Sequence, residues 1–345
     1  MSNDTLVLNM SIETSLTRLI KLVLFATPLG PSLLCSIYIM ICFVSESKLR
    51  RHNNHVMIAI IIIDFIELIF DLTAITLPYL HTGRVYNLSV CLYWVTGNYA
   101  LQGIAAWLMA WASIDRYLLI FHHRLRTTFI RHDLPLASIC IFIVSWYTTI
   151  TLTHPCSENW FDDTKFLCGG PCFNSSAIIT TMDWILIVLT PALLIILVNS
   201  FLLGRVLFQK CRCHSGVRRR LLTWRKTRKL LIQLLSIIFT FLITQVPLVI
   251  LSLVQISFAP DFLADISLIW LYYMPYLIYI VTPFVYIVTT KDCRTHICRR
   301  SRRIEAMATV PLHRQEHSNT YHRNIIPRMA LPLNNSSYPQ GQSVR

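Results

Sequence analysis

Seven apolar stretches, each long enough to cross a lipid bilayer, divide this chain of 345 residues. A hydrocarbon core of about 30 Å requires roughly 20 helical residues, and each stretch reaches that length. Within lipid, a single segment satisfies its own backbone polar groups only as an α-helix. The sequence therefore predicts an all-α membrane protein with a seven-transmembrane helix bundle. The stretches are Leu19–Val44, Val56–Leu80, Leu92–Phe121, Leu134–Thr153, Trp184–Phe208, Leu230–Phe258 and Ile266–Val288.

Basic residues predict the orientation of this bundle. Of the 31 Lys and Arg, 21 lie in the linkers after stretches one, three and five and in segment 291–303, whereas the N-terminus and the other linkers hold Arg18, Arg84 and Lys165. Basic residues gather on the cytoplasmic side of a membrane. We therefore expect the N-terminus outside and the C-terminus in the cytoplasm. The net charge of +14 then reflects topology and contact with anionic lipid, and no nucleic-acid partner is expected.

The same pattern divides the chain into four parts. We expect an extracellular N-terminus (1–18), the membrane domain (19–290), a short amphipathic basic helix on the membrane surface (291–303) and a disordered cytoplasmic tail (304–345). Cys293 and Cys298 in the basic segment suit S-palmitoylation. Four sequons on the predicted outer side are candidate glycosylation sites, namely Asn3, Asn9, Asn87 and Asn174.

Four of the eleven cysteines fall on the predicted outer side, where oxidising conditions favour disulfides. They are Cys91, Cys156, Cys168 and Cys172. Four cysteines allow three pairings, and counting alone does not choose among them.

A charged pair stands at the cytoplasmic end of the third stretch, as Asp115-Arg116-Tyr117. Each charge costs about 2.5–3.5 kcal/mol on insertion scales, so such residues are functional-site candidates. Cys91 precedes Arg116 by a helical rise of about 37 Å, which places the thiol at the outer membrane face and the charges at the inner one.

These features resemble the rhodopsin-like (class A) G-protein-coupled receptors, and the resemblance covers about Leu19 to Cys298. Further markers stand in family order at Asn54, Asp64, Trp146, Pro155, Pro191, Phe241, Pro247, Pro283 and Tyr286. The resemblance implies a multi-pass plasma-membrane receptor that binds an extracellular ligand and activates a heterotrimeric G protein. Arrestin-like regulators and the lipid bilayer are further candidate partners.

The resemblance also implies roles for single residues. Asp115, Arg116 and Tyr117 would couple to the G protein, and Phe241, Pro247, Pro283 and Tyr286 would serve activation. By the family pattern, the partner of Cys91 is Cys168 or Cys172.

Several family positions hold different residues here. Gln245 replaces the tryptophan of the sixth stretch, Thr282 the asparagine of the seventh, and Thr227 the glutamate that pairs with the conserved arginine in many relatives. No second ionic pair for Arg116 is therefore expected. Asp64 loses oxygen partners that a sodium ion would need, so we interpret it as a buried polar group.

Three acids of the second stretch, Asp64, Glu67 and Asp71, share one helical face. Carboxylates facing lipid are very costly, so this face is predicted to look into the bundle. The expected ligand is basic, either a peptide with an arginine or amidated terminus or a small amine. A purely structural role remains the alternative for Glu67 and Asp64. The predicted pocket residues are Glu67, Asp71, Asn98, Tyr99, Asp183, Gln245, Tyr272 and Tyr276.

Other functions have weaker support in the sequence. An opsin needs a lysine in the seventh stretch, where the family position holds Tyr276, and the amine-receptor aspartate is replaced by Asn98. A peptide receptor is therefore the leading subtype. No motif of a hydrolase or nucleotide-binding enzyme occurs, and no enzyme activity, cofactor or metal is expected. The alternative from another class is a transporter or channel that uses the acidic face of the second stretch.

Overall fold

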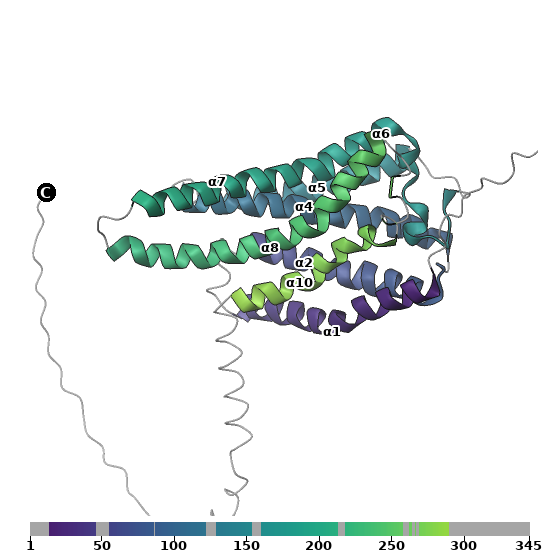
Figure 1. Ribbon diagram of the computed structural model, residues 1–345, viewed down its shortest axis with the longest axis horizontal. Coiled ribbons are helices and arrows are strands. Elements are labelled where there is room, and N and C mark those ends of the chain that lie inside the picture. Colours follow the sequence, from purple (N-terminus) through teal and green to yellow (C-terminus); the bar gives the residue numbers. More distant parts are fainter. Residues whose placement is uncertain are drawn as a thin grey trace, which may run out of the picture. The chain divides into compact units, whose positions relative to one another are not determined.

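The computed structural model describes residues 14–45, 55–85, 87–121, 129–153, 160–212, 218–257, 262–263, 266 and 269–289, without the side chains of 88, 119–120, 129–132, 206–212 and 218–234. Within these ranges the chain forms helices, joined by turns and irregular segments, and no strand. The helices run alongside one another as a bundle (Figure 1).

Long helices occupy the positions of all seven apolar stretches. The second helix consists of three consecutive elements, α2, η2 and α3. In the fifth helix, α6 and η7 directly precede α7. In chain order the elements are α1 (Ser15–Ser45), α2 (His55–Glu67), η2 (Leu68–Thr76), α3 (Leu77–Thr82), α4 (Leu88–Phe121), α5 (Phe129–Thr153), η5 (Phe166–Gly169), η6 (Cys172–Ser175), α6 (Ala177–Asp183), η7 (Trp184–Leu189), α7 (Thr190–Arg212), α8 (Arg218–Ser257), η8 (Leu271–Tyr273) and α10 (Met274–Thr289).

Five helical segments in the described residues are long and apolar enough to cross a membrane. They are Ser15–Ser45, Asp133–Thr153, Ala177–Arg205, Leu235–Gln255 and Leu271–Thr289. The second and third predicted stretches are not among them. The second is divided into α2, η2 and α3, and the third, α4, carries polar residues such as Asn98 and Gln102 in its N-terminal half.

Several helices extend past the apolar stretches that predicted them. α8 begins at Arg218, twelve residues before the apolar run starts at Leu230, because a helix that leaves the lipid can continue with polar residues. The last helix is shorter than the apolar stretch that predicted it. α10 begins only at Met274, after the short turn η8, whereas the apolar stretch begins at Ile266.

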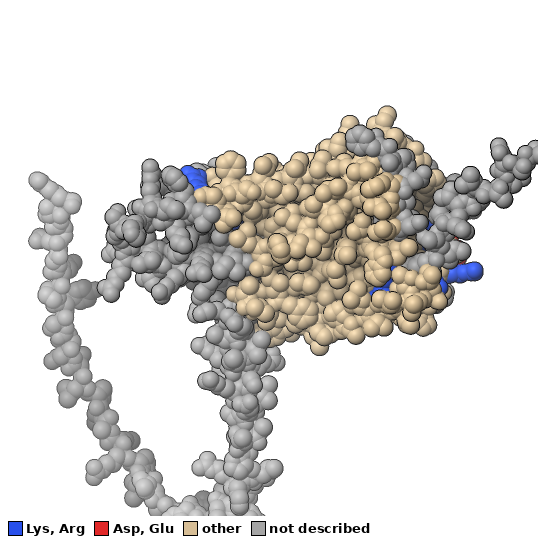
Figure 2. All heavy atoms as spheres, in the orientation of Figure 1, with Lys and Arg blue, Asp and Glu red and all other residues tan. Residues whose placement is uncertain are grey.

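α4 lies in the middle of the bundle and packs against α2, α5, α7 and α8, while α10 packs against α8, α1 and α2. Large apolar side chains cover the outside of the bundle, including Leu152 and Phe201 at 76% and 71% exposure. Figure 2 shows charged side chains only toward the ends of this face, with a broad uncharged band between them. An apolar exterior of this extent is expected where lipid is the solvent.

Two of the helices contain wide, π-helical turns, η2 in the second helix and η7 at the start of the fifth. Such turns are rare and occur frequently at functional sites. The hydroxyls of Thr73 and Thr190 donate to carbonyl oxygens five residues earlier, on Leu68 (2.6 Å) and Ile185 (2.7 Å), as expected for this wider turn. Both turns lie beside acidic residues of the predicted site.

The loop between α5 and α6, which the sequence predicts on the outer side and which we call the outer loop, is fastened to the bundle by a disulfide between Cys91 on α4 and Cys168 in η5. Cys168 is one of the two partners that the family pattern implied. Cys172 is disulfide-bonded as well, whereas Cys156 lies outside the described residues. The Tyr79 hydroxyl adds a hydrogen bond to the Thr164 carbonyl oxygen (3.1 Å). The loop is therefore held against α3 and α4 by covalent and polar contacts.

Candidate functional site

A cavity lies below the outer loop, between α4, α5, η7, α8 and the start of α10. Its volume of about 50 Å³ gives room for a few water-sized groups. Five of the eight predicted pocket residues line it, namely Asn98, Tyr99, Asp183, Gln245 and Tyr272. The other three, Glu67, Asp71 and Tyr276, are not among its lining residues.

Among the described residues that line this cavity, Asp183 is the only acidic one, and none is Lys, Arg or His. The carboxyl group is 3% exposed and stands at the junction of α6 and η7. The Trp146 indole N–H donates to Oδ1 (2.9 Å), and the Tyr147 hydroxyl approaches Oδ2 at 3.4 Å. A buried carboxylate with two donors keeps acceptor positions for a further donor. A cationic group in the cavity would supply one.

The remaining polar groups of the cavity are uncharged. On the α4 side, the Gln102 amide nitrogen donates to the Asn98 side-chain oxygen (3.0 Å). Gln245, on α8, adds a third amide, and Tyr99 and Tyr272 add phenol rings. Asp183 therefore supplies the only formal charge among the described lining residues, on one side of the cavity.

Asp71 is buried away from the cavity, in a dense hydrogen-bond network. Three groups donate to its Oδ1, the Trp94 indole (2.8 Å), the Tyr276 hydroxyl (2.9 Å) and the Thr76 hydroxyl (2.6 Å). The Asn98 amide nitrogen donates to Oδ2. With four donors, this carboxylate has most of its acceptor capacity filled by the protein.

Glu67 and Asp64 are also fully buried. Glu67 Oε1 lies 3.4 Å from the Asn98 amide nitrogen, and Glu67 Oε2 and both Asp64 oxygens have no hydrogen-bond partner among the described residues. The hydroxyl of Thr282, which replaces a family asparagine near Asp64, donates to the Ile278 carbonyl oxygen of its own helix (2.7 Å). The acid face therefore looks into the bundle, as predicted, but it meets packed side chains.

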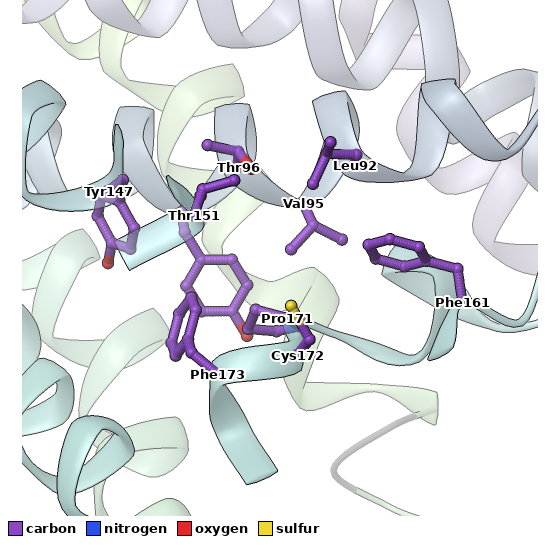
Figure 3. A pocket seen from close by; sticks show the side chains of 10 residues that line it. Leu92, Val95, Thr96, Tyr147, Thr151, Phe161, Pro171, Cys172 and Phe173 are labelled. Carbon is purple, nitrogen blue, oxygen red and sulfur yellow. The ribbon is translucent and has the colours of Figure 1, made fainter. Parts of the chain in front are cut away.

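Beside the cavity lies a narrower cleft, roofed by the outer loop (Figure 3). Figure 3 shows Leu92 and Val95 of α4 on one side and Pro171 and Phe173 of the loop on another. Its volume of about 10 Å³ is close to that required by one water molecule. This cleft is therefore too small to receive a ligand group, and the larger cavity is the candidate ligand site.

Three aromatic rings lie between the cavity and the cleft. The centroid of Tyr99 lies 6.2 Å from that of Tyr147 and 6.3 Å from that of Phe173, and the latter two are 6.5 Å apart. Because Tyr147 also contacts Asp183, this aromatic wall borders the carboxylate. Aromatic faces next to a carboxylate suit a cation.

At the other end of α4, Asp115 and Arg116 are buried, at 8% and 4% exposure. The Tyr117 hydroxyl accepts a hydrogen bond from Arg205 of α7 (2.8 Å). The four residues predicted to serve activation lie on α8 and α10. Phe241 lines the cavity and Pro247 lies within α8. Pro283 and Tyr286 are buried in α10.

The predicted modification sites are only partly described. Asn87 and Asn174 are exposed, before α4 and in η6 respectively. Asn3, Asn9, Cys293 and Cys298 lie outside the described residues, together with segment 291–303 and the tail 304–345. These modifications and segments stay predictions.

Among the polar contributors that sequence reasoning missed are Trp94, Gln102, Trp146 and Arg205. For the first two a signal existed, because Trp94, Asn98 and Gln102 recur every fourth residue and so share one face of α4. Trp146 and Arg205 bond to residues of other helices, Asp183 and Tyr117, and the sequence alone does not show which helices pack together.

Comparison with known proteins agrees with this architecture. Residues 36–286 match the family model of the 7 transmembrane receptor (rhodopsin family). The human histamine H4 receptor is 24% identical over 226 residues, covering 63% of this chain and 55% of that receptor. The rat histamine H4 receptor is 22% identical over 223 residues, with coverage of 62% and 55%.

The chain thus belongs to the rhodopsin family of seven-transmembrane receptors, and it is a multi-pass membrane protein. It spans about half the length of the two histamine H4 receptors.

Proposed function

We propose that this protein is a plasma-membrane receptor that binds a small cationic ligand at Asp183 and activates a heterotrimeric G protein. All seven apolar stretches would cross the membrane, with the N-terminus outside, the C-terminus in the cytoplasm and the basic segment 291–303 on the membrane surface. Family membership supports the receptor function. The observation that carries the ligand class is a buried carboxylate that lines a cavity with no Lys, Arg or His among its described lining residues.

Asp183 fits the role of a cation anchor on three grounds. It lines the cavity, two donors hold its carboxyl group in place, and aromatic rings border it. A close charge pair in a desolvated site can contribute several kcal/mol to binding. Asp71 and Glu67 of the acid face do not line the cavity, so we assign them a structural role.

The size of the cavity favours a small molecule over a peptide. A volume of about 50 Å³ beneath a loop fastened by the Cys91–Cys168 disulfide leaves little room for a peptide terminus. Both relatives are named for histamine, a small amine. A peptide that contacts only the outer loop is the competing outcome of the test below.

The proposal is tested with histamine, a panel of primary and tertiary amines, and arginine amide as a peptide-terminus probe. Activation is measured as nucleotide exchange on purified heterotrimeric G proteins. For the strongest probe, Asp183→Asn should lower potency at least tenfold, which corresponds to about 1.4 kcal/mol or more, without loss of surface receptor.

Asp162→Asn provides the matched control, because this outer-loop carboxylate does not line the cavity and bonds to Thr164 and Lys165. Equal potency of wild type and Asp183→Asn would exclude Asp183 as the anchor. Activity of arginine amide alone, insensitive to Asp183→Asn, would favour the peptide.

A further inference from the structure

A lysine is buried in the first helix, away from the ligand cavity. Lys21 lies in α1, which is long and apolar enough to cross a membrane, and its side chain is 0% exposed. None of the described residues of α1 lines the cavity. Charged residues inside membrane helices are costly and mark functional positions. Lys21 is therefore a candidate functional residue that the ligand site does not include.

The Lys21 ammonium faces two aromatic rings at the start of the last helix. It lies 4.0 Å from the centroid of the Tyr273 ring and 5.5 Å from that of Trp270. The two aromatic residues are joined by a tight turn, in which the Tyr273 backbone N–H donates to the Trp270 carbonyl oxygen (3.2 Å). A cation over aromatic faces is attracted most strongly where water is excluded. These contacts therefore fasten the turn to α1, which packs against α10 (Figure 1).

Apolar rings complete the surroundings of Tyr273, which is 2% exposed. Phe25, one turn after Lys21 on α1, stacks on it with the ring centroids 6.1 Å apart. Phe166 of the outer loop approaches it with a centroid distance of 4.1 Å, two residues before the cysteine that is bonded to Cys91. Tyr273 is thus held between α1 and the outer loop, and Lys21 adds a charged contact to this apolar packing.

The residue before Tyr273 belongs to the cavity. Tyr272 lines it, as does Pro275 near the start of α10, whereas Tyr273 is not among the lining residues. Consecutive side chains of the turn Leu271–Tyr273 therefore serve different sites, Tyr272 the cavity and Tyr273 the Lys21 contact. Because one short turn carries both side chains, a movement that releases Tyr273 from Lys21 also displaces Tyr272.

We propose that Lys21 is a positioning residue for the ligand cavity. Its contact with Tyr273 holds the turn Leu271–Tyr273 and thereby keeps Tyr272 in place at the cavity. α1, which contributes no described lining residue, then determines how closed this side of the cavity is. The effect on ligand binding rests on the proposed function, whereas the position of Tyr272 does not.

The first measurement needs neither ligand nor G protein. Ala106→Cys places a reporter thiol on α4 at the cavity, where Ala106 is 9% exposed. Its reaction with a small uncharged thiol reagent is followed above that of the chain's own cysteines. Lys21→Met keeps the length of the side chain and removes the charge, so the variant should fold. Loss of the contact should raise the reaction rate about fivefold, within the range for one cation–π contact.

Matched variants separate this role from general loosening of the bundle. Lys21→Arg keeps a cation that can stack on aromatic faces and should restore most of the protection. Leu24→Ala changes a 48% exposed side chain on the same helix and should leave the rate unchanged. Tyr272→Ala should itself raise the rate, and adding Lys21→Met should then change it little, because both act through the same side chain.

Three results of this measurement would contradict the positioning role. A rate in Lys21→Met within twofold of the Ala106→Cys background would overturn it. Equal rises in Lys21→Met and Lys21→Arg would do the same, because the cation would then not hold the turn. A full further rise on adding Lys21→Met to Tyr272→Ala would show that Lys21 does not act through Tyr272, and would also overturn it.

The second measurement connects Lys21 with the ligand. Binding of histamine and of the amine panel is measured as the rise in unfolding temperature in detergent. For the strongest probe, Lys21→Met should weaken binding about fivefold, and Lys21→Arg should weaken it less. If the thiol reaction responds but no probe binds the wild type, the positioning role stands and the proposed ligand class fails. If a probe binds and neither readout changes in Lys21→Met, the ligand class stands and the positioning role is wrong.

Discussion

Two buried carboxylates, Asp71 and Asp183, stand in contrasting parts of the bundle. Asp71 receives four donors and does not line the cavity, whereas Asp183 receives two and lines it. Both are 3% exposed or less, so burial does not distinguish them. The number of donors supplied by the protein distinguishes them, because a carboxylate whose acceptor positions are filled can accept few hydrogen bonds from a ligand.

The contrast arises from how completely the protein fills the hydrogen-bond acceptor positions of each carboxylate. A carboxylate with its hydrogen bonds complete stabilises the fold and resists removal, since its partners would be left buried and unsatisfied. A carboxylate with free acceptor positions is ready for a cation at some cost in stability. Asp71 should therefore matter for folding and Asp183 for binding.

The most severe change affects both regions at once. Cys91→Ala removes the bridge to Cys168, and with it the tether of the loop above the Asp183 cavity and beside the Trp94–Asp71 contact. We expect a loss of about 2–4 kcal/mol in stability and a strong reduction in surface receptor and ligand binding. Surface labelling and thermal unfolding in detergent measure the effect. Normal expression together with normal binding would contradict it.

The next prediction concerns Asp71 alone. In Asp71→Asn, the three donors at Oδ1 keep an acceptor, but an NH₂ group replaces the oxygen that faces the Asn98 amide nitrogen. Two donors then oppose each other in a buried site, at a cost of about 1–3 kcal/mol. Thermal unfolding should show this loss, while ligand potency in the surviving receptor changes little. A large potency shift without destabilisation would reverse the roles of the two acids.

An exchange of the two side chains sharpens the same comparison. Combining Asp71→Asn with Asn98→Asp restores a donor–acceptor pair between the positions, so much of the lost stability should return. The carboxylate now belongs to a residue that lines the cavity. Small amines should then gain about tenfold or more in potency over the Asp71→Asn variant. No recovery of the unfolding temperature would show that the network does not depend on this pair.

The sequence alone could predict the seven helical stretches, because their length and apolar character follow from the bilayer. Five of the eight residues that it predicts for the pocket line the cavity, and it offers two candidate partners for Cys91. It could not predict the hydrogen-bond network of Asp71, because the π-helical turn Leu68–Thr76 brings the Thr76 hydroxyl onto Asp71, five residues earlier. A period of 3.6 does not place residues five apart face to face.

The start of the last helix was equally hard to predict. The apolar stretch runs from Ile266, but η8 precedes α10, and the two tyrosines that follow take different positions. Tyr272 lines the cavity, whereas Tyr276 turns to Asp71. Both were predicted to line one pocket. Tyr276 belongs instead to the hydrogen-bond network around Asp71, which combines three helices distant in sequence.

The smallest expected effects come from the two donors that hold Asp183. The Trp146 indole lies 2.9 Å from Oδ1, whereas the Tyr147 hydroxyl lies 3.4 Å from Oδ2, near the limit for a hydrogen bond. Trp146→Phe leaves an aromatic ring but frees the carboxyl group to turn from the cavity, so potency should fall about fivefold. Tyr147→Phe keeps the ring that borders the cation and should change potency less than about twofold. Dose–response curves for the same amine probe compare them. Equal losses of potency in the two variants would mean that the aromatic wall, and not the orientation of Asp183, determines affinity. A larger loss of potency in Tyr147→Phe would identify the Tyr147 hydroxyl as a direct ligand contact.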